Sequence, residues 1–283
     1  YYIGFMYAGK SQYNKALEIL QEALAIHREV KDRKGEAKTL RDNKWQRYTL
    51  LMGLGSVYET IGKHQQALEV YQQSIAISQQ IEISKLLPHQ QKLLPQYQVI
   101  ILELISHNYR NLGEYDKALD FAQQMLKKAE SFNNPKLQVQ ALLHLASVYD
   151  HPFKNLSKAI ELSQKALNIA QKNKLLKEEA EVLLDLSGFY NQQRQYDTAL
   201  ESAQKALVVA KKLKNLQLEY SALYILRDIY QKQGEYQKAL EYAQRVYALV
   251  EKENLGIYKI TTLTYLSESY LNLGDTVKAE SAA

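Results

Sequence analysis

One alanine position recurs seven times along this 283-residue chain, at intervals of 51, 51, 41, 40, 40 and 40 residues. A tyrosine precedes each alanine by nine residues, or by ten in the fourth case. A period kept in register along the chain predicts a repeat protein, whose units bury on their neighbours an apolar face that none can bury alone. The anchor alanines are Ala16, Ala67, Ala118, Ala159, Ala199, Ala239 and Ala279, and the tyrosines are Tyr7, Tyr58, Tyr109, Tyr149, Tyr190, Tyr230 and Tyr270.

Each unit is predicted to form two helices joined by a short turn. Apolar residues such as Leu183, Leu186 and Phe189 precede the tyrosine at helical spacing, and a glycine often follows it, where a helix end requires positive φ. The chain has only 11 Gly and 4 Pro, which favours long helices over turn-rich β structure. Small residues stand three positions before the tyrosine, where the two helices would touch most closely: Gly4, Gly55, Ser106, Ala146, Ser187 and Ser267.

A shared motif runs through the units. It reads Leu-small-x-x-Tyr, as at Leu145, Ala146 and Tyr149, followed by a turn, an aromatic residue such as Tyr196, and the anchor alanine. Over essentially the whole chain this motif resembles the tetratricopeptide repeat. The 40-residue period is similar to the longer variety of kinesin light chains and cyanobacterial arrays. The resemblance implies an all-α solenoid, a right-handed superhelix of about seven helix-turn-helix hairpins, whose first helices line a concave face.

The repeat boundaries predict a single array over residues 1–283. The first unit lacks most of its first helix and the last is cut short in its second, whereas solenoids normally end in polar capping repeats. We therefore expect the chain to be an excerpt of a longer protein. The repeats are expected near 1–34, 36–84, 96–134, 136–174, 176–214, 216–254 and 256–283, with insertions near 38–48 and 85–95.

The two insertions each add 11 residues, which is about three helical turns and keeps a helix face nearly aligned. The first is predicted to extend one long helix from Gly35 to Gly62. The second contains two prolines, and Pro95 is predicted to start the following helix. Either the insertions pack on each other, or they form a docking or dimer contact. The residues of this expected insertion contact are Trp45, Leu86, Leu87, Leu93 and Leu94, with Tyr48 covered beside Trp45.

The family resemblance also implies which side chains face the concave groove. Their C-terminal half is acidic and would suit a basic or polar peptide, and the alternative is a solvated face without a ligand. Arg227 stands where other repeats have a small residue, so it either extends to solvent or reaches Asp228 or another acid. The expected groove residues are Glu103, His107, Arg110, His144, Ser147, Asp150, Glu181, Asp185, Asn191, Asp228 and Glu268.

Other chemistries have weaker support. The absence of Cys excludes a disulfide framework and a thiol nucleophile, and the six His residues show no metal-binding spacing. No apolar run is long enough to span a membrane. Lysines cluster where second helices should end, which complements the helix dipole or forms a ridge for nucleic acid. These clusters are Lys127 with Lys128, Lys172 with Lys174 and Lys177, and Lys211 with Lys212 and Lys214.

These features predict a non-catalytic scaffold or sensor module, located in the cytoplasm, that binds a protein or peptide in its groove. We expect no catalytic residues, no metal and no cofactor. One alternative is the regulatory arm of a larger effector, such as a caspase-like peptidase, whose chemistry lies outside this chain. Another is a weak nucleic-acid binder using the lysine ridge. A homodimer through the insertions or the truncated ends is a further expectation.

Overall fold

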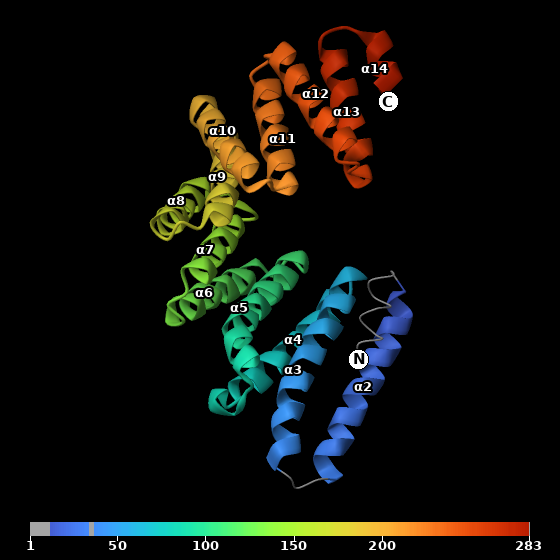
Figure 1. Cartoon of the computed structure of the whole chain (residues 1–283), viewed down its shortest axis with the longest axis vertical. Coiled ribbons are helices and arrows are strands. Elements are labelled where there is room, and N and C mark those ends of the chain that lie inside the picture. Colours follow the sequence, from blue (N-terminus) through green and yellow to red (C-terminus); the bar gives the residue numbers. More distant parts are fainter. Residues whose placement is uncertain (1–11, 34–36, 283) are drawn as a thin grey trace. The chain divides into compact units, whose positions relative to one another are not determined.

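A computed structural model describes residues 12–33 and 37–282, and all regular structure in those ranges is helical (Figure 1). The predicted all-α solenoid of hairpins is confirmed. The helices are α2 (Tyr13–Arg33), α3 (Ala37–Thr60), α4 (His64–Gln79), the 3-10 helix η1 (Ile83–Lys85), α5 (Pro88–Asn111), α6 (Tyr115–Ser131), α7 (Pro135–Asp150), α8 (Leu156–Lys172), α9 (Leu176–Gln192), α10 (Tyr196–Leu213), α11 (Leu216–Lys232), α12 (Tyr236–Lys252), α13 (Gly256–Asn272) and α14 (Thr276–Ala282).

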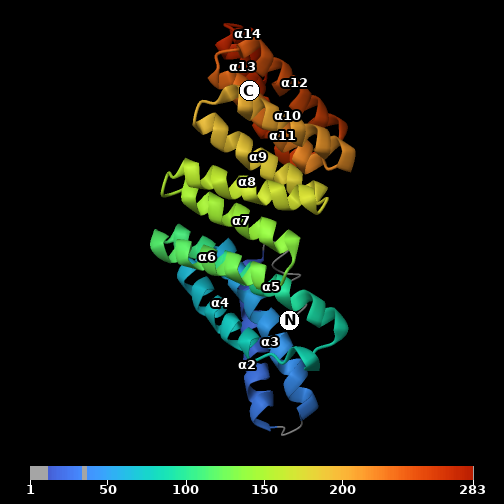
Figure 2. The same ribbon diagram turned by 90° about the vertical axis from the view of Figure 1, so that its left-hand side faces the viewer.

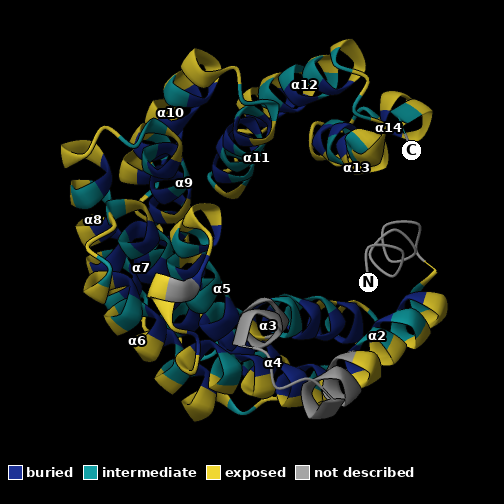
Figure 3. Cartoon of the chain, turned by 60° about the horizontal axis from the view of Figure 1, so that its bottom comes forward, coloured by how far each residue is buried: buried dark blue, intermediate teal, exposed yellow. Residues whose placement is uncertain are grey.

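The chain divides into two compact units, Tyr1–Val148 and Tyr149–Ala283, called unit 1 and unit 2. Odd-numbered helices from α3 to α13 are the first helices of the hairpins, and even-numbered helices are the second helices. Within unit 2, α10 packs between α9 and α11, α12 packs between α11 and α13, and α9 touches α11 (Figure 2). Buried residues lie along the helix surfaces that face neighbouring helices (Figure 3).

The sequence GEYDKAL at residues 113–119, which recurs as GEYQKAL at residues 234–240, forms the turn of the third hairpin and the start of its second helix. Gly113 has φ of +77°, a conformation that glycine adopts without steric cost. Glu114 forms an ion pair with Lys117, whose ammonium lies 5.3 Å from the centre of the Tyr109 ring. The anchor Ala118 is fully buried. Gly113, Glu114, Lys117 and Ala118 of the motif therefore each have a local structural role.

The small residue before each tyrosine allows the two helices of a hairpin to touch. Where that residue is serine, its hydroxyl donates to the carbonyl of the anchor alanine in the second helix. This bond satisfies the buried hydroxyl. The pairs are Ser106 Oγ to Ala118 O at 2.7 Å, Ser187 Oγ to Ala199 O at 2.8 Å, and Ser267 Oγ to Ala279 O at 3.0 Å.

Gly55 occupies the same position in the second hairpin and faces a much larger residue. A Cβ atom added to Gly55 would lie 2.7 Å from Cδ1 and Cζ of Tyr71, which is fully buried. The position corresponding to Tyr71 is four after the anchor alanine and holds alanine at Ala122 and Ala203. Where the first helix has glycine, the facing position of the second helix therefore holds a large residue. Where the first helix has Ser106 or Ser187, that position holds alanine.

A glutamine–tyrosine hydrogen bond joins successive hairpins. The glutamine stands five residues after the anchor alanine in the first six repeats. At four of these positions it donates from Nε2 of a second helix to the repeat tyrosine of the next first helix, so each such joint uses residues of two repeats. The sequence carries this signal, but the analysis above missed it. The bonds are Gln21 to Tyr58 at 2.7 Å, Gln72 to Tyr109 at 3.0 Å, Gln164 to Tyr190 at 3.0 Å and Gln244 to Tyr270 at 3.4 Å.

The predicted start of the helix after the second insertion is wrong. α5 begins at Pro88, and Pro95 lies inside it. Pro88 occupies the first turn, where its missing N–H would have no partner anyway. The backbone N–H of Leu87 donates to Gln90 Oε1 at 3.0 Å, which caps this turn. Because the helix starts earlier, Pro95 lies in its interior, where the missing N–H of proline removes one backbone hydrogen bond.

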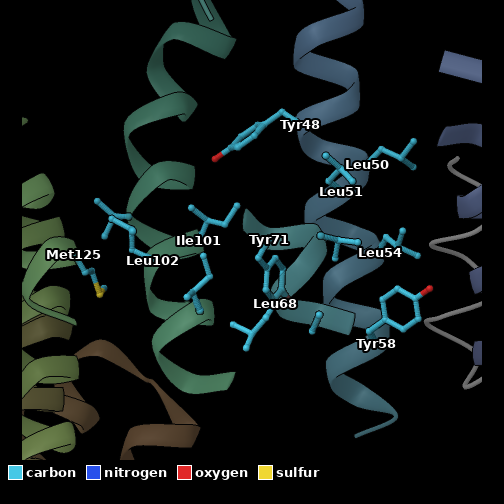
Figure 4. Packing of buried hydrophobic residues seen from close by; sticks show 14 of the residues in the cluster. Tyr48, Leu50, Leu51, Leu54, Tyr58, Leu68, Tyr71, Ile101, Leu102 and Met125 are labelled. Carbon is cyan, nitrogen blue, oxygen red and sulfur yellow. The ribbon is translucent and has the colours of Figure 1, made fainter. Parts of the chain in front are cut away.

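The first insertion extends α3, which runs from Ala37 to Thr60 and carries Trp45. Trp45 stacks on Tyr97 of α5, with ring centroids 5.7 Å apart and an interplanar angle of 14°. Tyr48 is fully buried beside both rings and appears in Figure 4 on the side of α3 that faces α5. The helices that carry the two insertions are therefore in contact through aromatic rings.

The leucines of the second insertion differ in how far they are buried. Leu86 and Leu94 are buried in the same cluster as Trp45, and Leu93 packs against that cluster while half-buried. Leu87 is 52% exposed, so the expectation that it covers Trp45 is wrong. It precedes Pro88 at the helix start, where the backbone is extended and directs the chain away from the cluster.

Trp45 is the chain's only tryptophan, so its fluorescence reports this contact alone. Replacing Tyr97 with alanine removes the stacked ring, and we expect the emission maximum to move to longer wavelength because water then reaches the indole. The matched control is Tyr115→Ala, which removes an exposed tyrosine of α6. An unchanged spectrum in Tyr97→Ala would contradict the stacked arrangement.

Candidate functional site

The sequence-predicted groove residues all lie on first helices, and this surface is called the first-helix face. Asn191 is buried, Asp185 and Glu268 are exposed, and the others are half-buried. Unit 1 and unit 2 are described separately. Unit 1 carries Glu103, His107, Arg110, His144 and Ser147, and unit 2 carries Asp150, Glu181, Asp185, Asn191, Asp228 and Glu268.

In unit 1, His144 of α7 is bonded to the framework of the third hairpin. Its Nε2 lies 2.8 Å from Ser106 Oγ. Because the Ser106 hydroxyl already donates to the Ala118 carbonyl, Nε2 must carry the proton and donate to Ser106. Burial lowers the pKa of His144 to about 4, with further lowering by the charge of Arg110 and by His107. His144 is therefore a neutral donor at ordinary pH.

Glu59 of α3 is the centre of the remaining polar residues in unit 1. It accepts a hydrogen bond from the Tyr71 hydroxyl at 3.1 Å, and its Oε1 lies 3.7 Å from His107 Nε2. Burial and the charge of Glu59 raise the pKa of Glu103. Burial lowers the pKa of His107, although Glu59 opposes this. The sequence analysis missed Glu59, although it follows the repeat tyrosine directly, as groove residues do.

The His144 contact makes stability depend on pH. The folded protein keeps His144 neutral down to about pH 4, whereas an exposed histidine with the ordinary pKa of 6.5 takes up its proton earlier. Stability should therefore fall as pH is lowered from 6.5 towards 4. We expect His144→Gln to remove about 1–2 kcal/mol of this loss between pH 7 and pH 5. Urea unfolding at both pH values measures it. The control His151→Gln, at an exposed residue, should keep the parent slope.

In unit 2, three carboxylates gather where α9 passes the end of α7. Glu181 lies 3.3 Å from the Lys177 ammonium, and Asp150 accepts a hydrogen bond from Gln192 at 3.3 Å. Asp185 has no ion pair or hydrogen bond with any residue in the described ranges. Asp185 keeps access to solvent although neighbouring protein partly encloses it. Burial, Glu181 and Asp150 together raise the pKa of Asp185 to about 7.

The raised pKa of Asp185 gives the opposite pH dependence. Between about pH 4 and pH 7 the folded protein holds a proton that the unfolded chain has released, so stability falls as pH rises through this window. We expect Asp185→Asn to stabilise the protein by about 1 kcal/mol at pH 8, less than the whole shift implies because the side chain is exposed. Thermal unfolding at pH 5 and pH 8 measures it. Equal pH slopes in parent and variant would contradict the shift, and Glu241→Gln on α12 is the control.

Two further predicted groove residues connect α9 to α11. The buried Asn191 donates from Nδ2 to Asp228 Oδ2 at 2.9 Å, and the Lys232 ammonium lies 2.8 Å from the same oxygen. Asp228 is thus already bonded within unit 2. Of the predicted groove acids in unit 2, Asp185 is the one without a hydrogen bond or ion pair in the described structure.

Arg227 takes the second of the two environments considered from the sequence, in which its head group reaches an acid. It is only 4% exposed, so the interpretation that its head extends to solvent is wrong, and its partner is Glu268 of α13 rather than Asp228. The guanidinium also lies 5.0 Å from the centre of the Tyr265 ring. Its Nε is buried without a hydrogen-bond partner in the described structure. Arg227 therefore ties α11 to α13.

Two tyrosine pairs lie between α11 and α13, one of them in contact with Arg227 through Tyr265, and neither was identified from the sequence. Tyr220 and Tyr258 have ring centroids 4.3 Å apart, and Tyr224 and Tyr265 have centroids 5.0 Å apart. Each pair joins α11 to α13. Rings at this position supply flat apolar surface and can bind cations through their faces.

Comparison with known protein families identifies the repeat. Tetratricopeptide repeat models match residues 178–252, 50–83 and 2–30. The chain is a tetratricopeptide repeat protein. A search of curated proteins finds no sequence match.

Several solved structures share the fold of this tetratricopeptide repeat chain. BtubC (BKLC) from P. vanneervenii has a TM-score of 0.65 at 20% identity, covering 76% of this chain and 86% of that one. Aspartyl phosphate phosphatase F from Bacillus subtilis has 0.68 at 13%, covering 100% and 67%. The Rap conjugation gene regulator of the plasmid pLS20, solved in complex with a peptide, has 0.54 at 15%, covering 99% and 69%. At these identities the likeness shows the fold.

The lysine clusters of the tetratricopeptide repeat chain lie at the ends of second helices, except that Lys177 lies in the first turn of α9. Lys174 and Lys214 have φ of 55° and 52°, so they occupy the left-handed position that ends each helix. Lys211 is 3.9 Å from Glu219, and Lys128 lies over the Phe132 ring at 5.1 Å. Among the residues described, no group of three or more His, Asp or Glu could hold a metal ion. No helix in the same residues is long and apolar enough to cross a membrane.

Proposed function

We propose that this tetratricopeptide repeat chain is a non-catalytic, cytoplasmic binding module whose hairpins form one array and whose first-helix face in unit 2 binds a basic peptide. The observation that carries the proposal is Asp185. An exposed carboxylate held next to Glu181 and Asp150, with no cation of its own, is electrostatically unfavourable until a positive charge arrives. An arginine or lysine of a peptide supplies that charge.

The surroundings of Asp185 favour a peptide over a simple cation. The Tyr220–Tyr258 and Tyr224–Tyr265 pairs lie on the next two first helices of the same unit. A peptide that places one cationic side chain at Asp185 could lay its chain along these rings, which add apolar contact and cation–π attraction. The fold relative solved with a bound peptide supports this class of ligand.

Selection of peptides tests the proposal directly. A random 12-residue display library is selected on the full chain, and recovered peptides are labelled and measured by fluorescence anisotropy. We expect a class rich in Arg and Lys whose affinity falls at least tenfold in Asp185→Lys and is unchanged in Glu241→Gln. Recovery of no basic peptides, or basic peptides that bind Asp185→Lys as well as the parent, would overturn the proposal.

Proton release gives a second, independent readout. A cation placed beside Asp185 lowers its pKa, so binding at pH 6.5 should release part of a proton. Calorimetry in two buffers of different ionisation enthalpy measures this release. We expect release from the parent and none from Asp185→Asn. Equal heats in both buffers for the parent would place the peptide away from Asp185.

A further inference from the structure

A cavity of about 440 Å³ lies in unit 1, between the second helices α4 and α6 and the first helix α5. Its floor includes the buried Ile101 and Leu102, and Figure 4 shows these two residues of α5 between Met125 of α6 and Tyr71 of α4. This place is separate from the first-helix face. The cavity is lined by Ile75, Ser78, Gln79, Gln98, Ile101, Leu102, Phe121, Gln124, Lys127, Lys128 and Ser131.

The corresponding places in unit 2 are bridged by polar pairs. At each junction, the residue twelve after an anchor alanine meets the residue eleven before the next repeat tyrosine. These pairs tie the end of one second helix to the start of the following first helix. The pairs are Gln171 with Glu179 at 3.0 Å, Lys211 with Glu219 at 3.9 Å, and Glu251 with Lys259 at 2.8 Å.

At the α4–α5 junction of unit 1 the same two positions hold Gln79 and Gln98. No hydrogen bond joins these two side chains in the described structure, and both line the cavity. Because the insertion starts α5 early, Gln98 lies well inside the helix rather than at its first turn. The α4–α5 junction, one of the two with added helical turns, therefore has an open, lined cavity.

The lining has two chemical halves. The floor is apolar, formed by Ile75, Ile101, Leu102 and Phe121. The rim carries Lys127 and Lys128, and no lining residue is acidic. Lys127 is exposed and has no ion pair among the described residues. An apolar floor beneath a cationic rim is complementary to an apolar side chain that carries carboxylates next to it.

The openness of the rim indicates whether the bound group belongs to a small molecule or to a peptide. Small ligands are usually enclosed over most of their surface. Here four lining residues are exposed, namely Gln79, Gln124, Lys127 and Ser131, so the cavity is open at the surface and a chain can continue past it. We propose that this cavity is a second binding site, which takes a leucine or phenylalanine flanked by Asp or Glu from an acidic peptide.

Two double variants test the site by different means. Lys127→Glu with Lys128→Glu reverses the charge of the rim. Gln79→Lys with Gln98→Glu rebuilds the bridge found at Lys211 and Glu219 and so closes the cavity. The control is Lys172→Glu with Lys212→Glu, which makes the same change of charge at exposed positions of unit 2. Circular dichroism checks that each variant is folded.

The random peptide library selected on the full chain supplies the probes, and octanoate is tested as a free amphipathic carboxylate. We expect a class of peptides with Leu or Phe beside Asp or Glu, whose affinity falls at least tenfold in both double variants and stays within twofold in the control. If the closed variant fails to fold, the rim variant decides alone.

Three results would overturn the proposal. They are recovery of no acidic peptides, acidic peptides that bind the rim variant as well as the parent, and octanoate binding without peptide binding. Because the basic peptides of the first proposal depend on Asp185, a failure at one site does not imply a failure at the other.

Discussion

Replacing Gly55 with alanine should lower the free energy of unfolding by about 3 kcal/mol, although the same change in an open helix raises stability by roughly 1 kcal/mol. The new Cβ would overlap the ring of Tyr71, which is fully buried, so the ring or the backbone must shift within a packed core. The Tyr71 hydroxyl also donates to Glu59 at 3.1 Å, so a displaced ring loses that bond. Urea unfolding of the full chain measures the change.

Gly188 of α9 provides the matched control, because a Cβ added there meets no atom within 4 Å. Gly188→Ala should stabilise by about 0.5–1 kcal/mol. Gly55→Ser with Tyr71→Ala reproduces the pairing of Ser106 with Ala122, and should be less destabilised than the sum of the single variants. If Gly55→Ala stabilised the protein as Gly188→Ala does, the close contact with Tyr71 would be wrong.

Glu268→Ala should destabilise by about 3 kcal/mol, because it leaves the guanidinium of Arg227 buried without a counter-charge. Arg227→Met should cost less, since it removes the charge and keeps apolar volume against the Tyr265 ring. The informative result is which of the two variants loses more free energy of unfolding. Thermal and urea unfolding of both measure it.

An exposed ion pair is the control for this comparison. Lys205 lies 2.6 Å from Glu201 on the surface of α10, and Glu201→Ala should change stability by less than about 0.5 kcal/mol. A loss in Glu268→Ala no greater than that in Glu201→Ala would show that Arg227 is not held by its pair. A larger loss in Arg227→Met than in Glu268→Ala would show that the arginine itself stabilises the α11–α13 contact.

The hairpins could be predicted from the sequence because each unit repeats the same local signals. Periodic apolar residues, a turn glycine and a small residue opposite the anchor alanine act within one hairpin, and seven copies reinforce the same pattern. The start of α5 could not be placed in the same way. Pro88 and Pro95 both suit a first helical turn, and the cap from Gln90 to Leu87 decides between them.

The candidate site was predictable in position but not in its bonding. The offset from the repeat tyrosine selects a face of the first helix, and so it found Asp185 and His144. It could not show that Ser106 would bond His144, or that Arg227 would reach Glu268 across 41 residues of sequence. Those contacts depend on neighbouring repeats, and the same limit hid the tyrosine pairs of α11 and α13.

The glutamine–tyrosine joints limit how the array can gain length. The joint spans 26 residues in unit 2 and 37 residues in unit 1, and the difference of 11 is the length of an insertion. Three added turns of helix return the tyrosine to nearly the same rotational phase, so the joint closes as before. An addition of nine residues would turn the tyrosine to the opposite side of its helix. A repeat array that gains residues in whole helical turns can therefore acquire new surface and still form the glutamine–tyrosine joint between successive hairpins.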